Sequence, residues 1–195
     1  MTDSRLSRPM PRHLLDRLIR LETPPPGRAP ALIGLSGRLV FSSLLLGYFW
    51  ASARTKIDMG GLSLNAYAQI FPRQFEQAGY DVSALGPVAH LIVAAGTLAE
   101  FMLPLFILLG LFTRLSSIGM IGFVVVMTLT DIYGHGIGPE TLGALFDRHP
   151  DGVVFDQRLV WVWLLAVLVT TGGGYASLDR ILARVRRRAG GLSGH

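Results

Sequence analysis

A carboxylate and a guanidinium occur inside segments of the chain that are otherwise apolar. Glu100 lies near the centre of residues 83–114, where His90 is the other internal ionisable side chain. Arg38 lies inside an earlier apolar segment, and Lys56 follows that segment. Charged groups at the centre of a bilayer are costly, so they face protein or water and commonly pair with one another. We therefore predict that Arg38 and Glu100 form a buried polar pair, and we include Lys56 with them as a candidate catalytic residue.

Two uses of such a pair remain open at the level of sequence. It could be an ion pair that locks two helices together. It could instead form a pocket in the middle of the membrane that binds a quinone head group or a proton. Pro104, four residues after Glu100, cannot donate the backbone hydrogen bond that the Glu100 carbonyl would accept, so the pattern predicts a kinked helix with a free acceptor beside the carboxyl group.

A second candidate cluster, which would bind a ligand, lies toward the other face of the membrane. Asp131 and His135 are four residues apart and share one face if the helix continues that far. His90, near the start of its apolar segment, is expected at a similar depth. Carboxylate and imidazole groups can bind a divalent metal or relay protons near neutral pH, and they also serve simply as hydrated capping groups. No definite metal site is predicted.

Four apolar segments must hold these residues in place. A helix rises about 1.5 Å per residue, so about 20 residues cross a hydrocarbon core of about 30 Å. The fold class that follows is an all-α bundle of four transmembrane helices within a membrane domain of residues 31–182. The four predicted spans are approximately residues 31–53, 84–112, 115–133 and 159–174. Between the first two spans, Leu64–Gln77 is amphipathic but interrupted by Pro72, and we expect it to fold back on the outer face.

The basic residues indicate how the bundle is oriented. Residues 1–30 form a basic arm with an interfacial helix over about residues 11–22, and residues 177–195 form a basic tail with an amphipathic helix. These two ends and the turn at Arg114 carry 12 basic and 4 acidic residues, whereas the two longer loops carry 5 basic and 8 acidic residues. The positive-inside rule then places both termini in the cytoplasm. Arg114 is predicted to be a topology anchor or a docking residue.

Composition excludes several classes of function. Half of the 195 residues are hydrophobic, which is too many for a soluble domain of this length. The chain has no cysteine, no haem-attachment motif and no dinucleotide-binding loop, so we predict no cofactor within the chain. The basic residues gather at membrane ends, which argues for a lipid bilayer as partner and against nucleic acid. Self-association is left open.

Several short motifs occur in a characteristic order. Arg38 lies early in the first span and Lys56 follows it in SARTKI. Glu100 begins the run EFMLPLFILLGLFTR, and the last span ends in GGGYASLD, whose three glycines we interpret as a loose, flexible helix exit. In this order and spacing, over residues 34–182, the chain resembles the DoxX family of small bacterial four-helix membrane proteins. The resemblance implies a multi-pass protein of the bacterial inner membrane. Some relatives resemble the membrane subunit of a thiosulfate:quinone oxidoreductase, and others are associated with redox or thiol-stress complexes.

The function that we favour from the sequence is a membrane component of a redox system. It would offer a quinone-facing or proton-linked pocket and dock a soluble or membrane partner that holds the electron carrier. The alternative is a non-enzymatic protein, either a carrier of small molecules or ions or a membrane assembly factor. Inverted repeats would favour a carrier, and the sequence contains no evident repeat.

Overall fold

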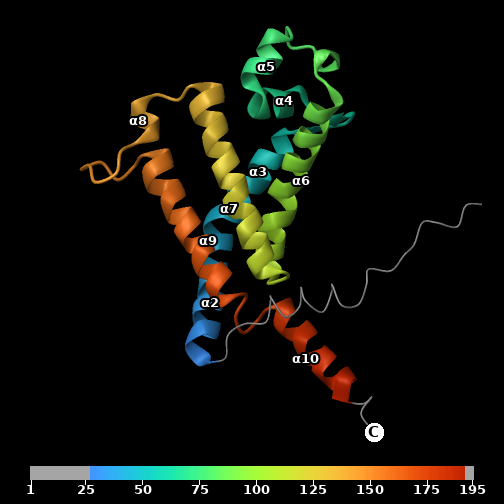
Figure 1. The fold of residues 1–195 in the computed structure, drawn as a ribbon, viewed down its shortest axis with the longest axis vertical. Coiled ribbons are helices and arrows are strands. Elements are labelled where there is room, and N and C mark those ends of the chain that lie inside the picture. The colour runs from blue at the N-terminus through green and yellow to red at the C-terminus, as the bar shows by residue number, and fades with distance from the viewer. Residues whose placement is uncertain (1–26, 192–195) are drawn as a thin grey trace, which may run out of the picture.

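The chain folds as a bundle of four long helices (Figure 1). The structure is a computed structural model in which residues 27–191 are described, with side chains to residue 185. Within that part, four helical stretches are long and apolar enough to cross a membrane: Arg28–Thr55, Pro87–Leu109, Thr113–His135 and Val153–Thr171. The predicted all-α fold with four candidate spans is thereby confirmed. The predicted interfacial helix at residues 11–22 lies outside the described residues.

Three of the four spans contain a π-helical turn. The first span consists of α2 (Arg28–Phe41), η1 (Ser42–Leu46) and α3 (Gly47–Thr55), and the second span is α6 (Pro87–Leu109). The third span consists of α7 (Thr113–Leu129) and η3 (Thr130–His135), and the fourth of η4 (Val153–Arg158) and α9 (Leu159–Thr171). Such turns often occur at functional sites, because the inserted residue changes the direction of nearby side chains. Here η3 carries Asp131 and η4 carries Arg158.

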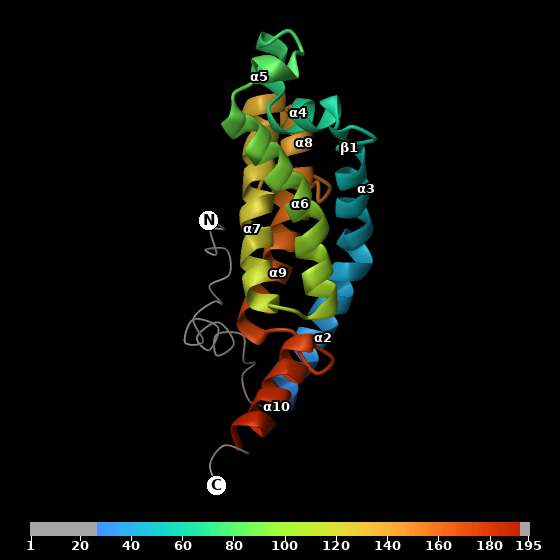
Figure 2. The same cartoon turned by 90° about the vertical axis from the view of Figure 1, so that its right-hand side faces the viewer.

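Neighbouring spans run antiparallel, as the short turn between the second and third spans requires. The N–H-free Pro87 occupies the first turn of α6, and Gly110 ends this helix in the left-handed conformation at φ +65°. Helix α7 packs between α6 and α9, and α9 packs against α2 (Figures 1 and 2). The turn between α6 and α7 and the last helix, α10 (Leu178–Gly191), therefore lie at one end of the bundle, here called the α10 end. We call the opposite end the loop end.

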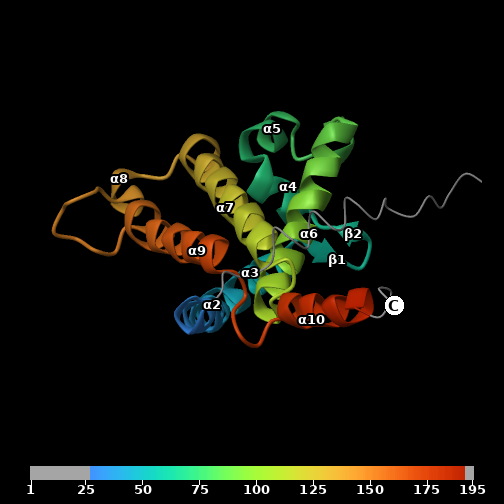
Figure 3. The same ribbon diagram turned by 60° about the horizontal axis from the view of Figure 1, so that its bottom comes forward.

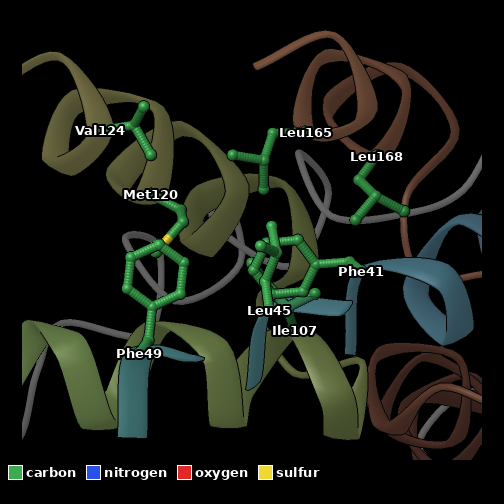
Figure 4. Close-up of a cluster of buried hydrophobic side chains, with 8 residues drawn as sticks. All are labelled: Phe41, Leu45, Phe49, Ile107, Met120, Val124, Leu165 and Leu168. Carbon is green, nitrogen blue, oxygen red and sulfur yellow. The ribbon is translucent and has the colours of Figure 1, made fainter. Parts of the chain in front are cut away.

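The core of the bundle takes side chains from all four spans (Figure 4). Its buried members are Phe41, Leu45, Phe49, Ile107, Met120, Val124, Leu165 and Leu168. Lipid tails are as apolar as these side chains, so in a bilayer this core stabilises the bundle through close packing rather than through removal of apolar surface from water. Phe49 makes edge-to-face contacts with Phe123 and Trp161, with ring centroids about 6 Å apart.

The loop end carries a small cap made from short elements. These are the antiparallel strands β1 (Ile57–Asp58) and β2 (Gly61–Leu62), the helices α4 (Leu64–Ile70) and α5 (Pro72–Gln77), and the 3₁₀ turn η2 (Val82–Ala84). The short helix α8 (Pro139–Leu142) lies apart from this cap and contacts η4 (Figure 1). The predicted interruption at Pro72 is confirmed, because α4 ends before this residue and α5 starts with it. Tyr67 and Phe75 pack with Val93 of α6, which fixes the cap on the second span.

The α10 end is closed by a glycine turn that the sequence led us to expect as a loose helix exit. Instead Gly172, Gly173 and Gly174 are buried. A side chain on Gly174 would collide with the backbone of α2 at Leu35, so this residue must be glycine, and its φ of +76° also favours glycine. The tight turn sends the chain into α10, which extends away from the bundle (Figures 1 and 3).

Candidate functional site

Glu100 forms a buried ion pair with Lys56. The Nζ of Lys56 lies 2.9 Å from Oε1 and 2.8 Å from Oε2 of Glu100, and it also donates to Oγ of Ser52 at 2.8 Å. The two charged side chains are only 3 % and 6 % exposed. Lys56 thus contributes all three of its N–H donors, and both carboxylate oxygens have a partner. The pair joins the loop end of the first span to the middle of the second.

The predicted pair between Arg38 and Glu100 is wrong. Arg38 is buried, but it donates to the carbonyl of Leu108 at 3.1 Å and to that of Ala176 at 2.7 Å. The reason is the direction of the side chains, because helical side chains lean toward the N-terminus of their own helix. The N-terminus of α2 is at the α10 end and that of α6 is at the loop end, so the side chains of Arg38 and Glu100 point apart. Lys56, at the C-terminus of α3, leans back into the bundle and meets Glu100.

Arg38 belongs to a structural network at the α10 end. Its two acceptors are the end of α6 and the segment that precedes α10. In the same region Asp179 of α10 accepts hydrogen bonds from the backbone of Phe112 at 2.7 Å and from the backbone and hydroxyl of Thr113 at 3.0 and 2.8 Å. These bonds satisfy N–H groups that would otherwise be free at the start of α7. Arg114 donates to the carbonyl of Thr170 at 3.1 Å and so links α7 to α9.

The three residues of the predicted outer cluster do not form one group. Asp131 forms a salt bridge with Arg158, which also donates to the hydroxyl of Thr128 at 3.0 Å. His135 Nε2 lies 3.2 Å from the carbonyl of Gln69. His90 is separate, because its Nδ1 lies 2.7 Å from the Tyr67 hydroxyl within the cap. In the described part of the chain, no three His, Asp or Glu side chains come together in a group that could hold a metal ion.

A cavity of about 480 Å³ connects the two ion-paired regions. Its polar lining consists of Tyr48, Ser52, Lys56, Gln69, Glu100, Thr130, Asp131 and His135. Its apolar lining consists of Ile70, Ile92, Ala95, Gly96, Ala99, Leu103, Gly119, Gly122, Phe123, Val126 and Met127. The structure therefore brings four of the predicted site residues into the lining of one cavity, namely Lys56, Glu100, Asp131 and His135, while Arg38, His90 and Arg114 lie elsewhere.

The apolar part of the cavity faces outward between two helices. Helices α6 and α7 diverge toward the loop end (Figure 1). On this side Ile92 is 45 % exposed and Val126 is 60 % exposed, and a side chain on Gly122 would meet no atom within 4 Å. In a bilayer such a surface lies against acyl chains. The cavity therefore has an apolar mouth toward lipid and a polar inner wall.

Most of this cavity lies within a recognised domain. Residues 35–131 match the model of the DoxX family. The chain belongs to the DoxX family. The matched segment includes the Lys56–Glu100 pair and ends at Asp131, whereas His135 and Arg158 follow it. The DoxX domain thus supplies most of the first three spans, and residues beyond the match supply the fourth. Searches of curated proteins and of solved structures returned no match.

Sequence reasoning missed several residues of this region of the DoxX protein, among them Arg158 and Tyr48. Arg158 was not selected, although it starts the fourth span at the depth where Asp131 ends the third, and antiparallel neighbours place such ends together. Tyr48 was not selected because a tyrosine in an apolar segment resembles an ordinary interfacial aromatic. The sequence feature that indicates a role for Tyr48 is its spacing from Ser52 and Lys56, because steps of four residues place all three on one helical face.

Proposed function

We propose that this DoxX protein is a multi-pass component of the bacterial inner membrane that binds a quinone head group in the cavity between α6 and α7. A partner protein that holds an electron carrier would dock on it, and both termini would face the cytoplasm. The observation that carries the proposal is the combination of a buried ion pair, Lys56–Glu100, with an apolar mouth in one cavity. A quinone has the matching chemistry, because it joins a polar ring to a long apolar tail.

The size and surroundings of the cavity support such a ligand. Small-molecule sites commonly enclose about 300–1,000 Å³ and combine an apolar lining with a few polar groups. The lining here has this composition, and Gly119 and Gly122 of α7 add no side chain to it, which leaves space in the cavity. The tail could therefore remain among the acyl chains while the ring enters the cavity.

The titratable groups in the lining suit proton transfer to such a ring. Reduction of a quinone to a quinol takes up two electrons and two protons. In the proposed system the electrons come from the carrier on the partner protein. The protons reach the quinone oxygens through His135, Asp131 and Glu100, which line the cavity from the loop end inward. His135, at the end of the third span, occupies the entry position of this route.

Filling the cavity tests the proposed site. The Gly122→Phe substitution places a ring in open space on a helix, so the protein should still fold, but quinone binding should weaken at least tenfold. Gly47→Phe is the matched control, because Gly47 is also helical, exposed and free of neighbours within 4 Å but does not line the cavity. Binding is measured by quenching of tryptophan fluorescence in nanodiscs containing the purified protein. Equal affinity of both variants would refute this site.

The proposed orientation can be tested with single cysteines, since the chain has none of its own. Phe146, in the loop after α8, is fully exposed. In spheroplasts, a membrane-impermeant maleimide should label the Phe146→Cys variant at once and label Ser193→Cys only after lysis. The cysteine-free protein gives the background. Labelling of the C-terminal cysteine in intact spheroplasts would reverse the proposed topology.

A further inference from the structure

We propose that Tyr48 is the residue that recognises the head group, by donating a hydrogen bond from its phenol to a quinone carbonyl oxygen. This inference rests on the proposed function and adds the group that makes the polar contact. Tyr48 lies in the cavity lining, on α3, one helical turn before Ser52 and two turns before Lys56.

The charged groups around the cavity have few donors left for a ligand. Lys56 donates to both oxygens of Glu100 and to Ser52, which uses its three N–H groups. In the other ion pair, the two terminal nitrogens of Arg158 donate to Thr128 and Asp131. Its Nε has no partner among the described residues, but Arg158 does not line the cavity. The ion pairs therefore shape the electrostatic field of the cavity, whereas contact with a carbonyl needs another donor.

Tyr48 provides a hydrogen-bond donor, its phenol hydroxyl, in the lining of the cavity. Among the described residues its hydroxyl has no hydrogen-bond partner, and the side chain is 48 % exposed. Inside a membrane an unsatisfied hydroxyl is costly, because no bulk water is there to bond it. Tyr48 shares the lining of the cavity with Glu100 of one ion pair and Asp131 of the other. A carbonyl bound here would satisfy the hydroxyl in the cavity that these carboxylates also line.

The ring of Tyr48 is fixed by its aromatic neighbours. Its centroid lies 5.1 Å from that of Phe49 in an edge-to-face arrangement and 5.4 Å from that of Trp161. Phe49 is buried in the bundle core, so this contact holds the phenol against the rigid part of the molecule. The donor is thus positioned before a ligand arrives, which reduces the entropy lost on binding.

The test uses Tyr48→Phe, which removes the hydroxyl and keeps the ring contacts. The probe is a ubiquinone with a ten-carbon tail and ¹³C-labelled carbonyls, added to the full-length protein in nanodiscs. A neutral hydrogen bond contributes about 0.5–1.5 kcal/mol, so the Kd should rise about threefold to tenfold. The infrared band of the bound carbonyl should move to higher frequency, because it loses its hydrogen bond. Tyr133→Phe, which removes another exposed phenol outside the cavity lining, should change neither value.

The possible outcomes are distinct. An unchanged Kd and carbonyl band in Tyr48→Phe would overturn the assignment of Tyr48 while the quinone site stands. A higher Kd with an unchanged carbonyl band would also overturn this assignment, since Tyr48 would then contribute packing alone. Failure of the unmodified protein to bind the quinone would refute both this inference and the proposed function.

Discussion

Replacing Glu100 by glutamine is expected to weaken quinone binding at least tenfold and to destabilise the protein. The substitution leaves Lys56 with no counterion at a position that is only 3 % exposed. Removing one partner of a buried ion pair typically costs about 3–5 kcal/mol, because the other charge stays buried and uncompensated. We expect the Glu100→Gln protein to accumulate less and to unfold at a lower temperature in detergent, measured by differential scanning fluorimetry.

A double variant separates the structural role of the pair from its role in binding. Lys56→Met with Glu100→Leu replaces both charges with apolar side chains of similar volume, an exchange that is often neutral or stabilising. Its unfolding temperature should therefore return to that of the unmodified protein or exceed it. Quinone binding should remain lost, because the polar wall of the cavity is gone. A double variant that is stable and binds quinone normally would mean that the pair serves only to lock two helices.

The architecture could be predicted from the sequence because it depends on properties that are local in the chain. Length and hydropathy define four spans, and the proline at position 72 marks a helix boundary in the structure as well. The helix ends at Pro87 and Gly110, by contrast, fall inside the predicted span of residues 84–112. Each of these signals acts within one helical segment and needs no knowledge of its neighbours.

Which charged residues pair depends on how the helices face one another, and the sequence constrains the facing of helices less than it constrains the positions of the spans. The tendency of buried charges to pair suggested that Arg38 and Glu100 meet, yet it does not include the direction in which a side chain leans. With that direction included, Lys56 becomes the natural partner of Glu100, since its side chain leads back into the bundle from the end of α3. The same reasoning finds Arg158 as the partner of Asp131, because both lie at the loop ends of adjacent antiparallel helices.

The Gly172–Gly174 turn shows a second limit of sequence patterns. Three consecutive glycines suggested a loose exit from the last span, but in the structure they permit close backbone contact. A side chain on Gly34 of α2 would overlap the carbonyl oxygen of Gly172 and lie 3.0 Å from the nitrogen of Gly174. Both obstacles are backbone atoms, which cannot move aside as a flexible side chain can.

Gly34→Ala is therefore expected to have a large effect on stability despite adding a single methyl group. The methyl group must push α2 away from the turn that leads into α10, and Arg38 would lose its alignment with the Ala176 carbonyl. Overpacking typically costs about 1–3 kcal/mol, and contact with backbone on two sides places this substitution near the upper value. We expect a clearly lower unfolding temperature in detergent for the purified Gly34→Ala protein.

Gly47→Ala is the control, because it makes the same change in the same span where the methyl group meets no atom within 4 Å. Alanine is favoured over glycine inside a helix by about 0.5–1 kcal/mol, so this variant should be as stable as the unmodified protein or slightly more stable. Quinone affinity should be unaffected by Gly47→Ala, since the residue does not line the cavity. Equal unfolding temperatures for the two variants would show that the glycine turn does not pack against α2. The burial of Arg38 would then need another explanation, because the contact between the glycine turn and α2, which positions the Ala176 carbonyl as its acceptor, would be absent.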